Sequence, residues 1–377
     1  MQLPSGKNRP ERLNDKKGDT SLRKILSALL AGLLLAGCLA LPAAAEAYGA
    51  PDITPATKME DIRQNPSILG AGIFTYSLDQ YRPLDRMYWN GQTLEKFSNR
   101  FTAWDTAKGL NFLIEQYNAG QQVTYPLYTK EEIRKDWTRR DAELYYFPAE
   151  QPNGKYLLII PGNAMVVSAE LREGVSSAWN LHEMGYTCFV LRYRIGAKAS
   201  NNAPLEDVAR AVRYITDHAE QFQVQPEEYA ILGYSSGGQI AGLFASDKLG
   251  YKTYGLNKPG ALLLGYPVNT FLEFKPVFNM IIDPFMVKQN YYDLTLSNYI
   301  TPDYPPTYHW YGKNDITLKT MCLTAQGPRL ENALQKNGIV HHYTVYSDAP
   351  HAIGAGKGTD AEGWLQDAVA FWEEQTA

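Results

Sequence analysis

The stretch Gly233-Tyr234-Ser235-Ser236-Gly237-Gly238 decides the fold. It separates an apolar run typical of a short buried strand from a run of small residues typical of a helix. A side chain at such a junction sits on a sharp turn, and glycines two positions before and after it remove the Cβ atoms that would clash there. The pattern predicts that the hydroxyl of Ser235 projects from the strand end as a nucleophile. The alternative is a glycine-rich turn that serves only packing.

Strand and helix patterns alternate on both sides of this turn. Apolar runs predict strands at 142–147, 156–160, 187–193, 229–233, 261–266, 307–311 and 341–346. Amphipathic spacing, capping residues and small-residue runs predict helices at about 169–184, 204–222, 235–245 and 328–337, and a closing helix from Thr359. This rhythm predicts an α/β fold with a mainly parallel sheet and helices on both faces. Functional groups in such a fold lie at the carboxyl ends of the strands.

A histidine is needed beside Ser235, because a serine hydroxyl is a poor nucleophile without a base. His351 follows the last predicted strand and precedes the closing helix. It therefore belongs to a carboxyl-end loop on the same rim of the sheet as Ser235, and we predict that it is the base. The expected roles of His341 and His342 are strand packing, and those of His182 and His218 are on helix faces.

The acid that orients this histidine is expected after the preceding strand. The predicted strand 307–311 runs into Gly312-Lys313-Asn314-Asp315, which makes Asp315 the candidate. Its task is to hold the imidazole tautomer and balance the charge of the imidazolium. Asp348 is the alternative because it is close to His351 in sequence, although a solvated turn aspartate is the interpretation that we favour for it.

Two backbone N–H groups are expected to stabilise the tetrahedral intermediate. One belongs to Ser236, the residue after the nucleophile, and the other to the loop after Ile160. In that loop the N–H of Asn163 is the candidate, with Ala164 as an alternative. The predicted site therefore consists of Ser235, Asp315 and His351 with an oxyanion hole made by Asn163 and Ser236.

Several further motifs are shared with one group of proteins. They are Ile159-Ile160-Pro161-Gly162, Glu173-Gly174, Leu191-Arg192-Tyr193-Arg194, Leu205-Glu206-Asp207-Val208 and Pro305-Pro306-Thr307. With these motifs, the Gly233–Gly238 turn and the Asp315 and His351 loops, the chain from about residue 123 resembles the acetyl-esterase and acetylxylan-esterase-like branch of the α/β-hydrolases, which includes feruloyl esterase-like members. The resemblance implies cofactor-free hydrolysis of small acyl esters, often acetyl groups on plant polysaccharides. Asn163 and Ala164 depart from the family pattern, because many relatives have a longer glycine run at these positions.

The predicted organisation has three parts. Residues 1–47 are a signal peptide or lipoprotein signal, 48–120 an N-terminal helical extension, and 121–377 the α/β-hydrolase domain. The clearest helix of the extension is expected at 103–118, and no motif there indicates a function. Residues 266–305 form an aromatic-rich, cap-like insertion at a strand's carboxyl end. We expect it either to cover the site or to pack into a small core of its own.

The N-terminus predicts export. A basic segment precedes the apolar run 25–41, and small residues suited to signal cleavage follow it. The expected location is extracellular, periplasmic or in the cell envelope. Leu35-Ala36-Gly37-Cys38 resembles a lipoprotein box, so membrane attachment through a lipidated Cys38 is one alternative to soluble release, and a retained anchor is another.

Charge and composition limit the partners and cofactors that the sequence allows. The formal charge is −4, and residues 1–45 carry a basic surplus, so the rest of the chain is more acidic still. This balance argues against nucleic acid as a partner and favours a small-molecule or polysaccharide ester. No metal-ligand cluster, phosphate-binding loop or dinucleotide motif is present in the sequence, so no metal or cofactor is expected. Two alternatives stay open: a peptidase of the prolyl-oligopeptidase type, and a non-catalytic binding protein on a hydrolase scaffold.

Overall fold

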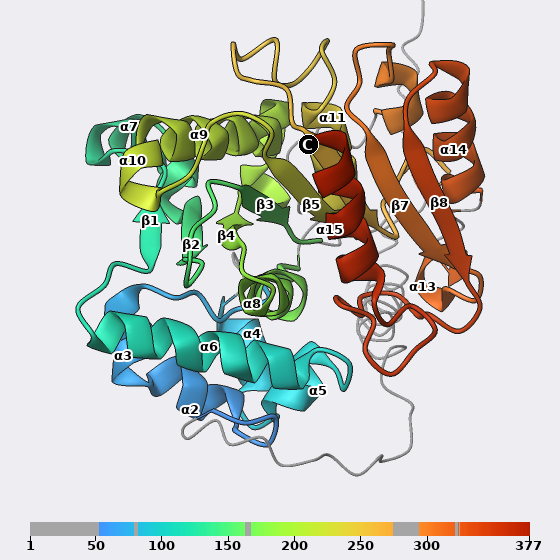
Figure 1. Cartoon of the computed structure of the whole chain (residues 1–377). Helices are drawn as coiled ribbons and strands as arrows, with labels where there is room; N and C mark the ends of the chain where they lie inside the picture. The colour runs from blue at the N-terminus through green and yellow to red at the C-terminus, as the bar shows by residue number, and fades with distance from the viewer. Residues whose placement is uncertain (1–52, 79–81, 163–166, 274–293, 321–322, 324) are drawn as a thin grey trace, which may run out of the picture. The chain divides into compact units, whose positions relative to one another are not determined.

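The computed structural model describes residues 53–78, 82–162, 167–273, 294–320, 323 and 325–377. Within these ranges an eight-stranded sheet has the order β1-β2-β4-β3-β5-β6-β7-β8 (Figure 1). The strands are β1 (Thr124–Pro126), β2 (Glu143–Phe147), β3 (Tyr156–Ile160), β4 (Thr187–Arg192), β5 (Ala230–Tyr234), β6 (Ala261–Gly265), β7 (Thr307–Gly312) and β8 (His341–Tyr346). β1 was not predicted, because three residues are too few to show a pattern.

The sheet is parallel from β4 to β8, and β2 pairs antiparallel with both β1 and β4. β3, β4, β5 and β6 are buried along their whole length, which explains why their sequences are continuous apolar runs. The chain runs from β3 to β4 on one side and then to β5 on the other. The strand order therefore reverses beside β3, and a sheet of this kind binds ligands outside the strand ends at such a reversal.

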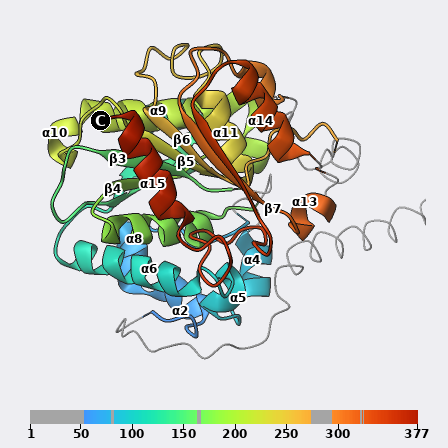
Figure 2. The ribbon, with the colours of Figure 1, turned by 45° about the vertical axis from the view of Figure 1, so that its right-hand side comes forward.

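Helices cover both faces of the sheet, so the predicted fold class is confirmed (Figures 1 and 2). α8 (Ser176–Glu183) and α15 (Trp364–Gln375) pack on one face, and α9 (Ala203–Asp217), α11 (Ser235–Phe244) and α14 (Gln326–Lys336) on the other. Shorter helical elements are α7 (Lys130–Lys135), α10 (Ala219–Phe222), α13 (Ile316–Thr320), the π-helical turn η3 (Glu170–Val175), and the 3₁₀ turns η2 (Trp137–Asp141), η4 (Gly196–Lys198), η5 (Ser200–Asn202) and η7 (Leu296–Tyr299).

The closing helix begins later than predicted. The spacing of Thr359 and Glu362 suggested a capping box, but the helix starts at Trp364. Gly363 precedes it with φ 96°, a left-handed conformation that interrupts the helical backbone. Glu362 instead accepts a hydrogen bond from the backbone N–H of Gly358, 2.9 Å away, so the two predicted capping residues belong to a turn.

The described part of the N-terminal extension is helical, with α2 (Met59–Gln64), α3 (Pro66–Ala71), α4 (Arg82–Trp89), α5 (Leu94–Ser98) and α6 (Ala103–Asn118). α6 has the predicted bounds and lies against α8 and η3. Gly109 of α6 allows this close approach, because a Cβ there would come within 2.7 Å of a Val175 side-chain carbon and 3.0 Å of the Val175 carbonyl oxygen. The extension therefore adds an outer layer over the α8 face of the sheet.

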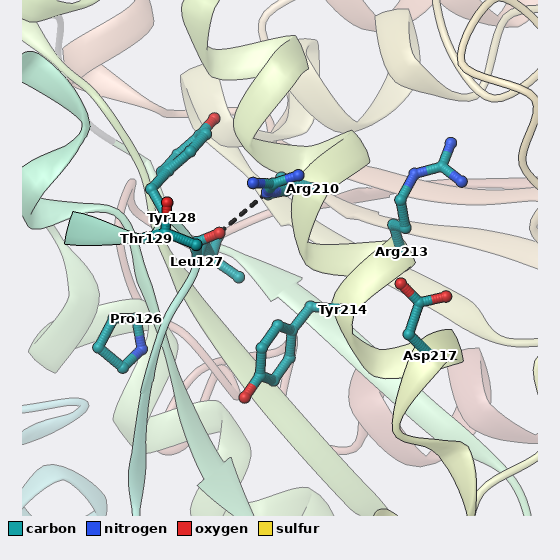
Figure 3. Close-up of a pocket in the computed structure, with 8 residues that line it drawn as sticks. All are labelled: Pro126, Leu127, Tyr128, Thr129, Arg210, Arg213, Tyr214 and Asp217. Carbon is teal, nitrogen blue, oxygen red and sulfur yellow. Dashed lines mark hydrogen bonds between the residues drawn. The ribbon is translucent and has the colours of Figure 1, made fainter. Parts of the chain in front are cut away.

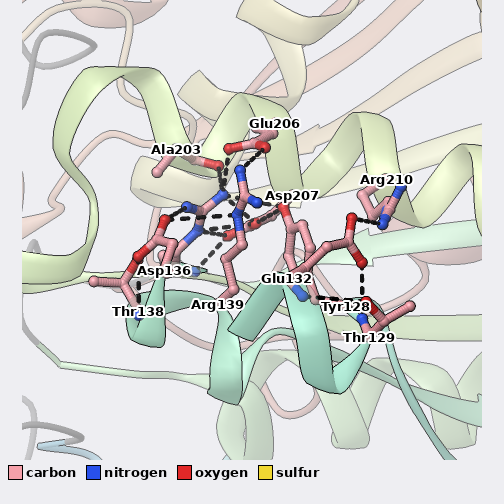
Figure 4. A network of polar contacts seen from close by, with 11 residues as sticks. Tyr128, Thr129, Glu132, Asp136, Thr138, Arg139, Ala203, Glu206, Asp207 and Arg210 are labelled. Carbon is pink, nitrogen blue, oxygen red and sulfur yellow. Dashed lines mark hydrogen bonds and ion pairs between the residues drawn. The ribbon is translucent and has the colours of Figure 1, made fainter. Parts of the chain in front are cut away.

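Two of the motifs that carry the family resemblance meet in one buried polar network (Figure 4). The Nε of Arg194, just after β4, is 3.0 Å from both carboxylate oxygens of Asp207 on α9, and the Arg194 backbone N–H donates to the same carboxylate. The Tyr128 hydroxyl also donates to Asp207, and Glu206 pairs with Arg194. These motif residues therefore join β4, α9 and the segment before α7.

Other predictions fall on segments that the structure does not describe. Cys38, Asn163, Ala164 and half of the cap-like insertion, residues 274–293, lie outside the described residues. Among the helices of the described ranges, none combines the length and the apolar character needed to cross a bilayer. The signal, lipidation and cap assignments, like the predicted domain boundaries, therefore stay predictions.

Candidate active site

Ser235 is placed by a strained turn between β5 and α11. It is the first residue of α11 and has φ 51°, a left-handed conformation that residues other than glycine rarely adopt. Strain of this kind persists only where the surrounding structure holds it, and it is often found at functional sites. The half-buried Ser235 side chain therefore leaves the carboxyl end of β5, beside the point where the strand order reverses.

The flanking glycines are required by close backbone contacts. A Cβ at Gly237 would lie 2.3 Å from the carbonyl oxygens of Ile160 and Pro161, at the end of β3. A Cβ at Gly233 would lie 2.8 Å from the Cα of Gly238. The glycine pattern therefore lets the first turn of α11 pack directly against the loop after β3.

The structure brings Ser235, His351 and Asp315 together although they are far apart in sequence. The Ser235 Oγ lies 2.9 Å from Nε2 of His351, and Nδ1 of His351 lies 2.6 Å from Oδ2 of Asp315. Because a carboxylate only accepts hydrogen bonds, Nδ1–H donates to Asp315 and Nε2 accepts from the serine hydroxyl. The arrangement can move a proton from the serine oxygen to the imidazole.

Both partners of the serine are well shielded. The side chains of His351 and Asp315 are 10% and 3% exposed. Asp315 follows β7 and its Oδ1 accepts a hydrogen bond from the Leu318 N–H, which anchors the carboxylate at the start of α13. The backbone that follows His351 is also unusual, since Ala352 has φ 61°.

The other aspartate and the other histidines that the sequence analysis considered do not join the hydrogen bonds between Ser235, His351 and Asp315. Asp348 is exposed, and its carboxylate accepts a hydrogen bond from the Asp360 N–H instead of contacting the imidazole. His182 bonds the Pro148 carbonyl from α8, and His218 the Tyr214 carbonyl at the end of α9. His341 and His342 pack along β8, where they contact Glu331 and Thr344 respectively. The interpretation of these groups as structural agrees with their positions.

The loop after β3 reaches the serine, as the sequence pattern requires. A Cβ on Gly162 would stand 3.1 Å from the Cβ of Ser235, so these two residues are in direct contact. The Gly162 N–H donates to Glu173 at 2.6 Å, and the Gly162 carbonyl accepts from the Ala169 N–H at 3.1 Å. Ser236, the residue after the nucleophile, is buried in the first turn of α11.

Sequence reasoning missed a second buried carboxylate at this site. Glu173 lies on η3 and is 1% exposed. Its Oε2 accepts from Gly162, and its Oε1 accepts from the hydroxyl of Tyr266, 3.0 Å away. The Tyr266 ring packs on the imidazole of His351, with 4.6 Å between ring centroids. Glu173 therefore connects the loop beside Ser235 to the ring beside His351, and its place in the Glu173-Gly174 motif was the only signal in the sequence.

A family model described as BD-FAE matches residues 143–257. This matched range contains Ser235 and Glu173, whereas Asp315 and His351 come from the chain beyond it. The hydrogen bonds of the structure add those two residues to the site.

Curated relatives align with slightly more than half of the chain. An acetylxylan esterase of Xylanibacter ruminicola is 23% identical over 57% of this chain and 44% of its own length. An endo-1,4-beta-xylanase B of Butyrivibrio fibrisolvens is 25% identical over 55% of this chain and 34% of its own. A probable carboxylic ester hydrolase, LipM, of Mycobacterium tuberculosis is 23% identical over 54% and 49%. The chain therefore spans less than half the length of each of these relatives.

Solved structures share the fold of this chain. An acetyl ester-xyloside bifunctional hydrolase from Caldicellulosiruptor lactoaceticus has a TM-score of 0.53 and 20% identity, covering 67% of this chain and 95% of that one. A carboxylesterase from Lactobacillus plantarum has a TM-score of 0.51 and 19% identity, covering 62% and 92%. The α/β-hydrolase fold expected from the sequence is thereby confirmed.

Two opposing effects act on the imidazole of His351. Burial alone lowers the pKa of His351, but the negative charge and hydrogen bond of Asp315, followed by the charge of Glu173, outweigh burial and raise the pKa above its usual value. Burial also raises the pKa of Glu173, against the favourable charge of His351 and the hydrogen bonds from Gly162 and Tyr266. The two carboxylates therefore favour the protonated form of His351.

The lining of a hollow of about 310 Å³ includes none of Ser235, Asp315 and His351 (Figure 3). It is lined by Pro126, Leu127, Tyr128, Thr129, Arg210, Arg213, Tyr214 and Asp217. Its arginines are engaged, because Arg210 donates to the Leu127 carbonyl and Arg213 to the Tyr254 carbonyl. Among the described residues, no group of three or more His, Cys, Asp or Glu side chains is arranged to hold a metal ion.

Proposed function

We propose that the chain is a carboxylic-ester hydrolase that forms an acyl-enzyme on Ser235. The observation that carries this proposal is the continuous hydrogen-bond chain from the Ser235 Oγ through His351 to Asp315, with distances of 2.9 and 2.6 Å. Nucleophile, base and orienting acid are already within the range that proton transfer requires. Two of the relatives named above are themselves named as esterases, which supports ester hydrolysis over other hydrolase chemistry.

The reaction proceeds in two halves. His351 Nε2 accepts the hydroxyl proton as Ser235 Oγ attacks the ester carbonyl, and the resulting imidazolium returns that proton to the leaving alcohol. A water molecule then attacks the acyl-enzyme by the same route and releases the acid and the free serine. Asp315 stays ionised throughout, holds Nδ1–H, and stabilises the positive charge that forms on the ring.

The negative oxygen of the tetrahedral intermediate is held by backbone amides in this proposal. The Ser236 N–H, at the positive end of α11, is one donor, and the N–H of Asn163 is the other. The contact between Gly162 and Ser235 supports this placement, because it puts the loop that continues to Asn163 beside the nucleophile. The N–H of Gly162 itself is already bound to Glu173.

For the substrate we propose small acyl groups, acetyl above all, on carbohydrate or similar esters. The names of the acetylxylan esterase and of the acetyl ester-xyloside hydrolase support this choice. We also propose that the chain is exported, with soluble release, lipidation at Cys38 or a retained anchor as the possible outcomes. The basic segment and the apolar run 25–41 support export.

A substrate panel tests this function. The purified protein is assayed on p-nitrophenyl acetate, p-nitrophenyl butyrate, a feruloyl ester, acetylated xylan and a dipeptide anilide. The proposal expects turnover of the acetyl esters and fluorophosphonate labelling at Ser235. Faster cleavage of the anilide than of every ester would indicate the peptidase, and a folded protein that neither labels nor turns over would indicate the binding protein.

The charge of Glu173 predicts a specific pH effect. A raised pKa means that His351 takes up its proton at a higher pH, and the protonated ring cannot accept the proton of Ser235, so kcat/KM falls as the pH falls through that pKa. In Glu173→Gln the amide oxygen still accepts from Gly162 while the NH₂ donates to the Tyr266 hydroxyl, so mainly the charge is lost. We expect the acidic fall of kcat/KM to move to lower pH, with kcat above it reduced less than about tenfold.

The matched control for this change is Glu362→Gln. It removes the same charge from an exposed position and should leave the pH profile in place. The measurement is kcat/KM on p-nitrophenyl acetate from acid to alkaline pH. An unchanged profile in Glu173→Gln, or a shift to higher pH, would contradict the assigned role of its charge.

A further inference from the structure

The N-terminal extension reaches the backbone next to His351. The side-chain NH₂ of Asn99, which ends α5, donates to the carbonyl oxygen of Ala352 at 2.8 Å. Figures 1 and 2 both show the loop after β8 passing beside α5. Ala352 follows His351 directly and has φ 61°, a left-handed conformation that residues with a Cβ rarely adopt. This bond therefore holds an unfavourable backbone conformation at the residue after the imidazole.

The orientation of the Asn99 amide is set by its other contacts. Its Oδ1 accepts hydrogen bonds from the backbone N–H groups of Phe101 at 2.9 Å and Thr102 at 3.2 Å. Only the amide oxygen can accept these bonds, so the NH₂ group must face Ala352. Asn99 itself has φ 118°, so its backbone is also strained. A strained residue whose side-chain amide bonds through both its oxygen and its nitrogen indicates a specific positioning contact.

The rest of the same loop is held from the same side. Lys357 pairs with Asp105 of α6 at 2.7 Å, and the Asp105 side chain is 4% exposed. Asp105 also accepts from Asn180 of α8 at 2.9 Å, which connects the loop, the extension and the sheet layer. Gly354 lies so close to the extension that a Cβ there would come within 3.1 Å of the Thr102 methyl carbon. The extension thus packs along one side of the loop that contains His351.

We propose that Asn99 is a positioning residue for His351, so that the N-terminal extension is part of the catalytic unit and more than an accessory layer. This inference rests on the proposed function of His351 as the base. Asp315 fixes the far nitrogen of the ring and Tyr266 packs on its face, while Asn99 sets the backbone from which the ring projects. Without that bond the 351–352 backbone relaxes and the Ser235–His351 distance changes. A shift of this kind costs transition-state stabilisation and leaves ground-state binding in place.

Two variants test the inference, so that the test still works if one of them fails to fold. Asn99→Gly removes the amide, and glycine adopts φ 118° without strain, so this variant is expected to fold. Asn99→Asp keeps the Oδ1 acceptor for Phe101 and Thr102 but puts an oxygen opposite the Ala352 carbonyl. The control is Asn65→Ala, which removes the N-terminal cap of α3 in the same extension with no contact to the His351 loop.

The readouts are kcat and KM on p-nitrophenyl acetate, the rate of fluorophosphonate labelling, and the thermal unfolding midpoint. For both Asn99 variants we expect kcat and the labelling rate to fall by about tenfold to a hundredfold, with KM within about twofold of the wild-type value. Asn65→Ala should lower the unfolding midpoint and keep kcat within about twofold.

Two results would overturn the inference. One is a folded Asn99→Gly protein with kcat within twofold of the wild-type value, and the other is an equal loss of kcat in Asn65→Ala. If the wild-type protein itself neither hydrolyses esters nor labels at Ser235, the proposed function fails and the inference fails with it. That case is distinguishable, because it shows in the unmodified chain.

Discussion

Ser235→Ala is expected to lower kcat on p-nitrophenyl acetate by on the order of a millionfold, because the atom that forms the acyl bond is gone. The fold should stay intact. The substitution removes only the hydroxyl, and alanine meets the same φ of 51° that serine already tolerates. Fluorophosphonate labelling should disappear together with turnover.

Ser67→Ala is the matched control for this change. Ser67 lies on α3 and its hydroxyl donates to Asn118, so the substitution removes a hydroxyl remote from the site. Both variants are compared with the wild-type chain by kcat, labelling and thermal unfolding. If Ser235→Ala kept more than about one part in a thousand of the wild-type kcat, the acyl-enzyme on Ser235 would be ruled out.

Asp315→Asn is expected to lower kcat by roughly ten-thousandfold through the wrong histidine tautomer. The Leu318 N–H donates to Oδ1, so an asparagine here would place its oxygen at that position and turn its NH₂ toward His351. Nδ1 would then accept, and the ring would carry its proton on Nε2, facing Ser235. A ring in that state cannot take up the serine proton.

Asp348→Asn distinguishes the two carboxylates that sequence reasoning considered. Asp348 is exposed and bonded to the Asp360 backbone, so its loss should change kcat less than about threefold. The measurement is kcat at a pH well above the acidic fall. Equal losses in both variants, or a larger loss in Asp348→Asn, would assign the acid to the other loop and refute the role of Asp315.

The sequence predicted the central trio because each member follows a strand with a readable apolar run. Ser235, Asp315 and His351 come after β5, β7 and β8, and the carboxyl ends of parallel strands meet at one edge. Their contact in the structure follows from that rule. The catalytic roles of the three residues, and of Ser236 and Asn163, await the kinetic tests above.

Contacts between distant segments escaped the sequence analysis for a physical reason. Asn99 and Ala352 are 253 residues apart, and an asparagine that ends a short helix looks the same whether or not its amide has a distant partner. Glu173 was visible in a motif, but its burial depends on how η3 packs under the β3 loop. Neither contact has a local periodicity that pattern reasoning could detect.

The packing of α6 on α8 has a consequence for attempts to isolate the hydrolase part of the chain. Phe112 of α6 stacks on Phe147 of β2, with 5.6 Å between ring centroids, and also contacts Trp179 and His182 of α8. A truncated protein starting at residue 121 would lack Phe112 and would leave the rings of Phe147, Trp179 and His182 without this cover. A newly uncovered aromatic surface of this kind promotes self-association. Fusion or truncated proteins that contain this sheet should therefore also include the helices that precede residue 121.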